Sequence, residues 1–157
     1  MITIHRQLTR SVSEQAKASA RLRKNYNFHE DYADPVNRML NAFEPGTYVR
    51  PHKHESPDKC EVFIILEGRA LALRFNDSGT ILDHAVLDHA AGVYGVEFAA
   101  REWHTLISLA PGTVLYEVKQ GPYVQIADKN FAAWAPPEDS AEAPAYLNSL
   151  LQQLGFA

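Results

Sequence analysis

The sequence predicts an all-β protein, an antiparallel sandwich or barrel with short helical extensions at its N- and C-terminal ends. The main observation is a series of short apolar runs between residues 46 and 126, which are separated by turn residues. No helical pattern lies between these runs, and strands at such a spacing are typical of antiparallel sandwiches and barrels. The segments before and after this region have helical patterns, so we expect helices only at the two ends.

Length and composition indicate one globular domain. The chain has 157 residues, of which 46% are hydrophobic and 22% are charged, and these values are ordinary for a soluble protein. We divide this single domain, residues 1–157, into an N-terminal helical and extended segment (1–45), a β-barrel core (46–126) and a C-terminal wrap with a helix (127–157).

Charge and hydropathy limit the expected partners. The net charge of -4 gives no sign of nucleic-acid binding, which usually requires a basic face. No run approaches eighteen apolar residues, so we expect no membrane partner. The first residues lack an apolar signal-peptide core, and the single cysteine cannot form an intramolecular disulfide. A cytoplasmic protein is the expectation.

The N-terminal segment has two helical signals. Ser11 and Glu14 have the spacing of a capping box, and the chain up to about Lys24 is rich in Ala, Lys and Arg. A second short helix is expected in "DPVNRMLNAF", with Asp34 as its N-cap and Pro35 at its first helical position.

The central region predicts consecutive strands. The runs "EVFIIL" and "RALALRF" are separated only by Glu67 and Gly68, which is the signal of a two-residue hairpin. The further strands are expected in "TILDHAVL", "GVYGVEF", "HTLISL" and "TVLYEVK". After Gly121 the pattern changes: "FAAWAPPEDSAEAP" is expected to wrap the outside of the barrel, and an amphipathic helix to run from Pro144 to near Gly155.

Two histidines and a carboxylate suggest a metal site. His52 and His54 are one residue apart in an extended segment, so their side chains point to the same face. Glu61 begins the next apolar strand, and His104, which begins another, is the candidate fourth ligand. This donor set suits one divalent transition metal (Fe, Zn, Mn or Ni, which the sequence does not distinguish) and leaves an open coordination position.

Tyr48 and Arg50 are candidate substrate-binding residues. In an extended chain they alternate onto the face of His52 and His54. An arginine inside a small barrel requires an anionic partner, either a buried carboxylate or an acidic substrate. The expected ligand is therefore a small molecule that carries negative charge.

The other polar residues are expected outside the site. Glu117 and Lys119 share one face of their strand, and the apolar residues of the opposite face are expected to point to the core. His84 and His89 flank a turn and are expected on the surface, whereas His29 could approach the mouth of the barrel.

The segment from Gly46 to Gly68 resembles the first motif of the cupin superfamily, G-x5-H-x-H-x3,4-E-x6-G. Here Gly46, His52, His54, Glu61 and Gly68 match it, with six residues instead of three or four between the second histidine and the glutamate. The resemblance implies a cupin barrel (double-stranded β-helix or jelly roll) with short helical N- and C-terminal extensions.

One residue competes with Glu61 in the first cupin motif, and three residues depart from the second. Glu55 lies nearer to the histidines, but only Glu61 keeps the distance to the glycine and begins a strand. In the second motif, G-x5-P-x-G-x2-H-x3-N, His104 takes the histidine place, while Ala99, Arg101 and Ser108 replace the proline, glycine and asparagine.

The segments "NFHEDYADPVNRMLNAFEPGTYVRPHKH", "EWHTLISLAPGTVLYEVKQGPY" and "FAAWAPPE" are similar to WbuC-type cupins over roughly residues 20–138. This resemblance implies a small bacterial, cytoplasmic metalloprotein often encoded beside surface-polysaccharide genes, and small cupins often form homodimers. It supplies no reaction. We expect a metal-dependent enzyme (isomerase, epimerase, lyase or dioxygenase) acting on a small anionic or sugar-derived molecule. A non-catalytic sensor or carbohydrate-binding module and a purely structural metal remain the alternatives.

Overall fold

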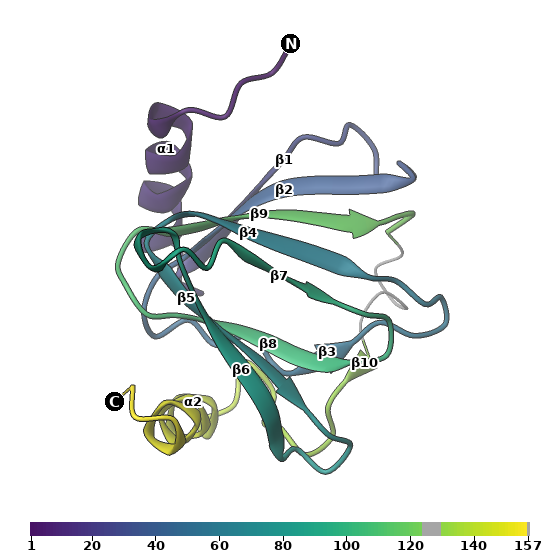
Figure 1. Ribbon diagram of the computed structural model, residues 1–157, viewed down its shortest axis with the longest axis vertical. Helices are drawn as coiled ribbons and strands as arrows, with labels where there is room; N and C mark the ends of the chain where they lie inside the picture. The colour runs from purple at the N-terminus through teal and green to yellow at the C-terminus, as the bar shows by residue number, and fades with distance from the viewer. Residues whose placement is uncertain (124–129, 157) are drawn as a thin grey trace.

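The computed structural model describes residues 1–123 and 130–156, and it contains two five-stranded antiparallel sheets that face each other (Figure 1). The first sheet has the strand order β1 (Arg23–Asn27), β2 (Val36–Phe43), β9 (Thr113–Gln120), β4 (Glu61–Glu67), β7 (Gly95–Phe98). The second has the order β10 (Asn130–Phe131), β3 (His52–Lys53), β8 (Trp103–Ser108), β5 (Arg69–Phe75), β6 (Ile81–Asp88). The helices are α1 (Arg6–Lys17), a 3-10 turn η1 (His89–Ala91) and α2 (Ala143–Gln153). The prediction of an all-β fold with helical ends is confirmed.

The space between the sheets is apolar at one end and polar at the other. The apolar part is a cluster of buried side chains from both sheets, among them Phe43, Phe63, Ile65, Leu106 and Leu115. Further along the same strands, the inward positions become polar. Since side chains alternate along a strand, each strand contributes to both parts with a single face.

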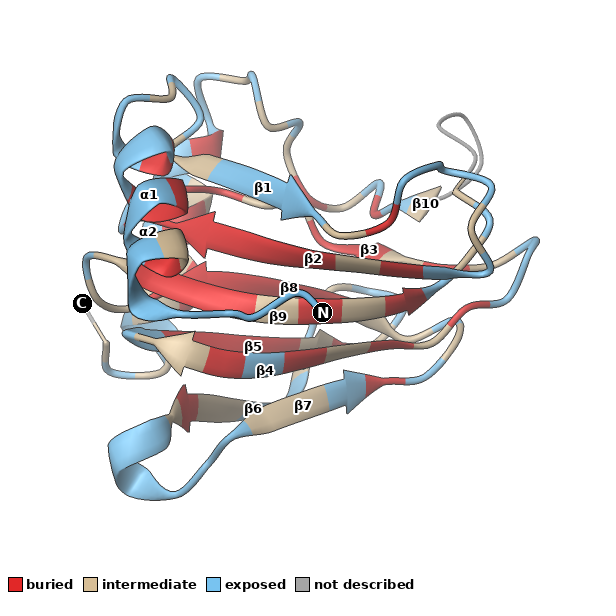
Figure 2. Ribbon diagram, turned by 90° about the horizontal axis from the view of Figure 1, so that it is seen from above, coloured by how far each residue is buried: buried red, intermediate tan, exposed pale blue. Residues whose placement is uncertain are grey.

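Helices cover the outer face of each sheet. On the first sheet, Val12 and Ala16 of α1 pack against Leu40, Ala42 and Val114 (Figures 1 and 2). On the second sheet, apolar side chains of α2 pack in the same way. The buried residues of that cluster include Tyr48, Leu71, Leu73, Ile107, Leu147 and Leu150. Each sheet is therefore covered on its outer face where its helix packs.

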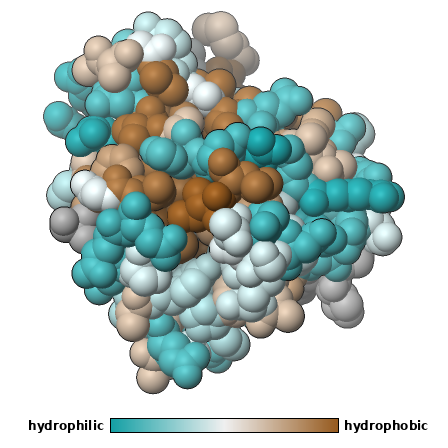
Figure 3. Space-filling model, turned by 60° about the horizontal axis from the view of Figure 1, so that its bottom comes forward, coloured by the Kyte–Doolittle hydropathy of each residue, from teal (hydrophilic) through white to brown (hydrophobic). Residues whose placement is uncertain are grey.

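The lower side of the molecule in Figure 1, where α2 and β6 lie, comes forward in Figure 3. Apolar residues gather in the middle of this face (Figure 3), and partly buried side chains of α2 and its C-terminal extension, Leu151, Leu154 and Phe156, belong to the cluster beneath it. The helix expected from Pro144 is thus confirmed as a packing element. No helix among residues 1–123 and 130–156 has the length and apolar character needed to cross a membrane.

The N-terminal helix begins earlier than the sequence signals indicated. It starts at Arg6, and the Nδ1 atom of His5 accepts a hydrogen bond from the backbone N–H of Leu8. Ser11 and Glu14 therefore lie inside the helix, so the capping-box interpretation was wrong. A histidine ring nitrogen can accept the free N–H of a first turn as a serine hydroxyl does.

The prediction of a second helix with Asp34 as its N-cap was wrong. Residues Val36–Phe43 form β2, which pairs with β1 on one side and β9 on the other. Both faces of this strand are used: Met39 faces the interior, and Leu40 packs under α1. The Asp-Pro signal for a helix start describes only the local chain. The packing of the strand, with one face to the interior and the other under α1, overrides this local preference.

The hairpin expected at Glu67 and Gly68 was also wrong, because β4 and β5 lie in different sheets. Gly68 has a positive φ of 74°, and a Cβ atom there would lie 2.5 Å from the hydroxyl oxygen of Thr113. The glycine therefore lets the chain cross from one sheet to the other in close contact with the start of β9.

Candidate metal centre

The four predicted ligands come together from both sheets at the polar end of the sandwich. His52 in β3 is the register partner of His104 in β8, and His54 follows directly after β3. Glu61, the first residue of β4, approaches from the opposite sheet. The four residues that the spacing singled out thus lie together, each at or next to the end of a strand.

The donor atoms of this cluster converge. One ligand atom from each of the four residues lies within 4.8 Å of the others. The Oε1 atom of Glu61 is 2.5 Å from Nε2 of His104, 3.3 Å from Nε2 of His54 and 3.9 Å from Nε2 of His52. All four residues are at most 4% exposed, so bulk water does not compete for these atoms.

Backbone carbonyls orient two of the imidazole rings. Nδ1 of His52 lies 3.1 Å from the carbonyl oxygen of Arg50, and Nδ1 of His104 lies 2.8 Å from that of Glu102. Because a carbonyl oxygen only accepts, both Nδ1 atoms carry a hydrogen, and the Nε2 atoms point into the cluster. Metal-binding histidines commonly donate their other ring N–H to a backbone carbonyl in this way.

The arrangement requires a positive centre. With its hydrogen on Nδ1, a neutral His104 would direct the Nε2 lone pair at the carboxylate oxygen of Glu61. Either protonation of the imidazole or a nearby metal ion removes this repulsion. The ring of His104 is also stacked on Phe98, with centroids 4.3 Å apart and planes at 15°, so it cannot easily turn away.

Glu61 is held as a carboxylate. Its burial is the largest single influence and raises its pKa, but the charge and hydrogen bond of His104, with those of His54, outweigh it. The pKa of Glu61 is therefore well below its ordinary value. Three imidazole nitrogens and one carboxylate oxygen in a buried cluster fit a divalent transition metal, so these four residues can hold such an ion.

Neighbouring residues that could compete as ligands lie outside the cluster. The carboxylate of Glu55 pairs with Lys53 at 2.9 Å, and the described metal-binding cluster contains Glu61 instead. His84 and His89 are exposed, as expected. His29, by contrast, is only 7% exposed and lines the cavity beside the cluster.

A cavity of about 430 Å³ extends from the cluster along the inner face of the first sheet. The cluster residues His52, Glu61 and His104 form part of its wall. Four carboxamides also line it: Asn25, Asn27, Asn37 and Asn41. Its charged lining in the described residues comprises Arg21, Arg23, Lys119, Glu61, Glu117 and Glu138.

Glu117 and Lys119 line this cavity, so their expected exclusion from the site was wrong. They are 7% and 5% exposed, and Nζ of Lys119 lies 3.7 Å from Oε1 of Glu117. Asn41 donates a hydrogen bond to the other oxygen of Glu117. The apolar residues on the opposite face of β9 pack against the outer layer; of these, Val114 lies under α1.

Tyr48 and Arg50 lie elsewhere than the alternation suggested. Residues 46–51 are not part of a strand, and Val49 lines the cavity instead of its two neighbours. Tyr48 packs against α2 and donates a hydrogen bond to the carbonyl of Pro136 at 3.0 Å. The expectation that both share the face of His52 was wrong, because regular alternation begins only at β3.

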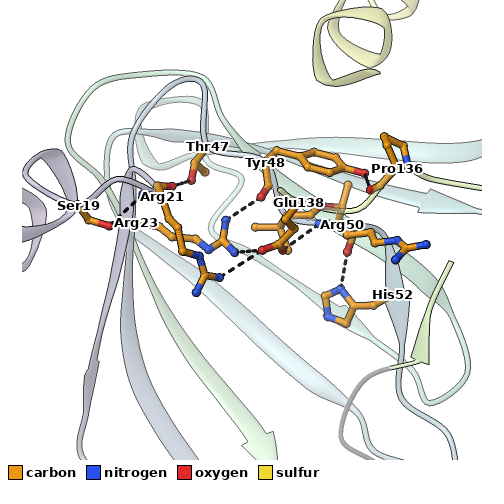
Figure 4. Close-up of polar contacts among 11 residues, drawn as sticks. Ser19, Arg21, Arg23, Thr47, Tyr48, Arg50, His52, Pro136 and Glu138 are labelled. Carbon is orange, nitrogen blue, oxygen red and sulfur yellow. Dashed lines mark hydrogen bonds and ion pairs between the residues drawn. The ribbon is translucent and has the colours of Figure 1, made fainter. Parts of the chain in front are cut away.

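The side chain of Arg50 binds the backbone. Its guanidinium donates to the carbonyl oxygen of Ala132 from Nε at 3.1 Å and from Nη2 at 2.7 Å. Figure 4 shows the guanidinium and the ring of His52 pointing in different directions. The contact of Arg50 with His52 runs through its carbonyl oxygen, so Arg50 supports the cluster through its main chain.

The sequence did not predict a group of ion pairs in another part of the cavity wall. Arg23 and Arg21 both donate to Oε2 of Glu138, while the backbone N–H of Arg50 donates to Oε1 at 3.2 Å (Figure 4). One carboxylate therefore faces two guanidinium groups, which leaves one positive charge in excess. No local pattern reveals this group, because Glu138 is more than a hundred residues from both arginines.

A family model described as "Domain of unknown function (DUF6016)" matches residues 4–87, which is more than half of the chain. No curated protein matches the sequence.

Solved structures show the fold. L-ribose isomerase from Cellulomonas parahominis is similar with a TM-score of 0.54 and 15% identity, over 71% of this chain and 69% of that one. KdgF from Halomonas sp. is similar with a TM-score of 0.50 and 13% identity, over 66% and 83%. The capsular polysaccharide assembling protein CapF from Staphylococcus aureus is similar with a TM-score of 0.54 and 14% identity; the match covers 69% of this chain and 29% of CapF. The fold of the chain is the cupin fold.

Proposed function

This chain belongs to the family described as a domain of unknown function, DUF6016, and from that premise we propose that it is a metal-dependent enzyme acting on a small anionic or sugar-derived molecule. The observation that carries the proposal is the convergence of His52, His54, Glu61 and His104 beside a cavity whose wall includes three of them. A purely structural ion would need no such space beside it.

The charge of the cavity favours an anionic ligand. Among the described lining residues, three basic side chains are balanced by three acidic ones. A divalent ion bound by the cluster would leave two positive charges in excess. One lies at the ion and Glu61, and the other lies where Arg21 and Arg23 share Glu138. A carboxylate or phosphate group is therefore favoured at either position.

Two further groups favour an enzyme over a binding module. Catalysis needs a titratable group near the metal in addition to its ligands. Glu117 and Lys119 supply a carboxylate and an ammonium within the cavity, and both are buried. When bound, the metal would supply Lewis-acid activation of a ligand oxygen. Glu117 would accept a proton from the ligand and Lys119 would donate one, as isomerisation, epimerisation or elimination requires.

The finer parts of the proposal rest on the resemblance to WbuC-type cupins. These are a bacterial origin, a cytoplasmic location, a link to surface-polysaccharide biosynthesis and a homodimer. CapF shares the fold, and its name refers to capsular polysaccharide, but at 14% identity the likeness carries no activity to this chain. Sedimentation velocity would test the dimer, for which the free edge of β7 with the exposed Tyr94 before it offers one surface.

The experiment for this proposal starts from protein purified without oxygen, with the bound metal identified by elemental analysis. The protein is then stripped, reloaded with Fe, Zn, Mn or Ni, and assayed on sugars, sugar phosphates and hydroxy acids. We expect turnover of at least one compound that depends on the added metal and is lost in Glu117→Gln. Ligand binding without turnover under every metal would favour the binding module instead.

A further inference from the structure

Asn37 is a buried polar residue that has no role in the metal-dependent activity proposed above. It lies in β2, is 1% exposed and lines the cavity. Neither its Oδ1 nor its Nδ2 atom has a hydrogen-bond partner within residues 1–123 and 130–156. Buried carboxamides are nearly always hydrogen-bonded, because an unsatisfied donor and acceptor lose their contacts with water and regain nothing. A ligand or a water molecule in the cavity can supply the missing hydrogen bonds.

Strand register fixes Asn37 relative to the metal cluster. Asn37 in β2 is the partner of Lys119 in β9, and Lys119 is the partner of Glu61 in β4. The three side chains form one row on the inner face of the sheet. Neighbouring strands are ~4.8 Å apart, so Asn37 is about 10 Å from Glu61 along this row. A single sugar-sized molecule can reach both ends.

Gly121, in the loop after β9, packs against one side of Asn37. A Cβ atom at Gly121 would lie 1.8 Å from the carbonyl oxygen of Asp34 and 2.9 Å from Nδ2 of Asn37. The glycine thus packs closely against the carboxamide on the side of the loop. The open space beside the carboxamide is the cavity.

The chemistry of the carboxamide selects the ligand group. Nδ2 donates and Oδ1 accepts, and the group carries no charge at any ordinary pH. A hydroxyl group, which both donates and accepts, satisfies such a pair, whereas a carboxylate only accepts and an alkyl chain does neither. Discrimination for hydroxyl groups is strong at sites of this kind, because the analogue that lacks them leaves buried polar atoms unpaired.

We propose that the cavity binds a polyhydroxylated acid of sugar size, whose acidic end lies at the metal cluster and whose remote hydroxyl groups bind Asn37. This inference rests on the proposed metal function and adds the class of its substrate. Lys119 and Glu117, between the two ends, then face the middle of the ligand. Asn37 is thus a specificity-determining residue.

Two matched pairs of probes test the proposal. D-gluconate and hexanoate have the same chain length and charge, and so do galactarate and adipate; within each pair only the hydroxyl groups differ. Binding is measured by calorimetric titration on the metal-loaded protein, with metal content determined on the same sample. We expect at least one hydroxylated acid to bind tenfold or more tightly than its counterpart, and Asn37→Leu to remove that difference.

The stability of the same variant gives an independent readout. Asn37→Leu replaces an unsatisfied amide by an apolar group of similar size, so its melting temperature without ligand should equal or exceed that of the wild type. Asn130→Leu is the matched control, because its Nδ2 atom already donates to the carbonyl of Glu55 at 3.0 Å. This control should lower the melting temperature and keep the preference for hydroxyl groups.

The results of these experiments distinguish a failure of this inference from a failure of the proposed metal-dependent function. Absence of bound metal would overturn the proposed function. A metal-loaded protein that binds each acid and its counterpart equally, or binds none of the four, would overturn the ligand class inferred here and the role of Asn37, and would leave the metal site standing. An Asn37→Leu variant with a lower melting temperature and an unchanged preference would show that the residue holds a structural water only.

Discussion

Glu61 and Lys119 are cross-strand partners on the inner face of the first sheet, and both line the cavity. Both residues are buried, and Lys119 also lies 3.7 Å from Glu117. The cluster is thus continuous with a second set of ionised side chains, and the cavity joins the two.

This relationship predicts the effect of removing Lys119. Lys119→Met leaves Glu117 as a buried carboxylate with one charge partner fewer, and breaking a buried ion pair typically costs about 3 kcal/mol. We expect urea unfolding to show a loss of this order, while metal content stays close to that of the wild type. The double variant Glu117→Gln, Lys119→Met should regain much of the loss; if it is as unstable as the single variant, the two residues are not coupled.

The identity of the carboxylate ligand gives a second prediction. Glu61→Gln should weaken metal binding by about one to two orders of magnitude, because the amide oxygen carries no charge. Glu55→Gln is the matched control and should change little, since Glu55 pairs with Lys53 outside the cluster. Metal titration in the presence of a competing chelator measures both constants. A stronger effect for Glu55 would mean that the inserted loop folds onto the site in solution.

The pH dependence of stability follows from Glu138. Burial raises its pKa, but the charge and hydrogen bond of Arg23, with smaller contributions from Arg50 and Arg21, lower it below the ordinary 4.5. A carboxylate whose pKa is lower in the folded state stabilises the protein above the unfolded pKa and loses this contribution as the pH falls through the folded value.

Glu138→Gln should therefore be less stable than the wild type at pH 7, and the difference should shrink below about pH 4.5, the ordinary pKa of the group. Thermal unfolding from pH 7 to pH 3 measures this. A difference that is constant over the whole range would show that the charge of Glu138 contributes nothing to stability.

A substitution of Arg50 tests whether its side chain has a structural role or binds substrate. Its guanidinium donates two hydrogen bonds to the carbonyl of Ala132. Arg50→Lys cannot keep both, so we expect a lower melting temperature and unchanged binding of phosphate and citrate. The opposite pattern, intact stability with weaker anion binding, would restore the role in substrate binding that the sequence predicted for it and for Tyr48.

The strands from β4 to β9 were predictable because each is a short apolar run bounded by turn residues. The β2 strand was not, because the Asp34-Pro35 signal describes only the local chain, while pairing with β1 and β9 decides its conformation. The prediction of a hairpin at Gly68 was wrong for a related reason. A glycine with positive φ permits a tight turn and also a crossing between sheets, and contact with Thr113 decides between them.

In the site, too, some residues could be predicted from the sequence and others could not. His52, His54 and Glu61 lie close in sequence, so their spacing carried the prediction, and His104 began a recognisable strand. The orientation of Glu117 could not be read from alternation, because α1 covers part of the outer face of the sheet and an apolar face suits the helix side as well as the interior. The arginines that share Glu138 come from distant segments that only the folded chain brings together.

The central claim is that the four residues at the end of the cavity bind a metal ion, and metal stoichiometry tests it most directly. Elemental analysis of protein purified without oxygen should give about one divalent ion per chain. The variant His52→Ala, His54→Ala should retain less than a tenth of this amount. The exposed His84→Ala, His89→Ala pair should retain all of it. Full metal occupancy in the first double variant would contradict the account.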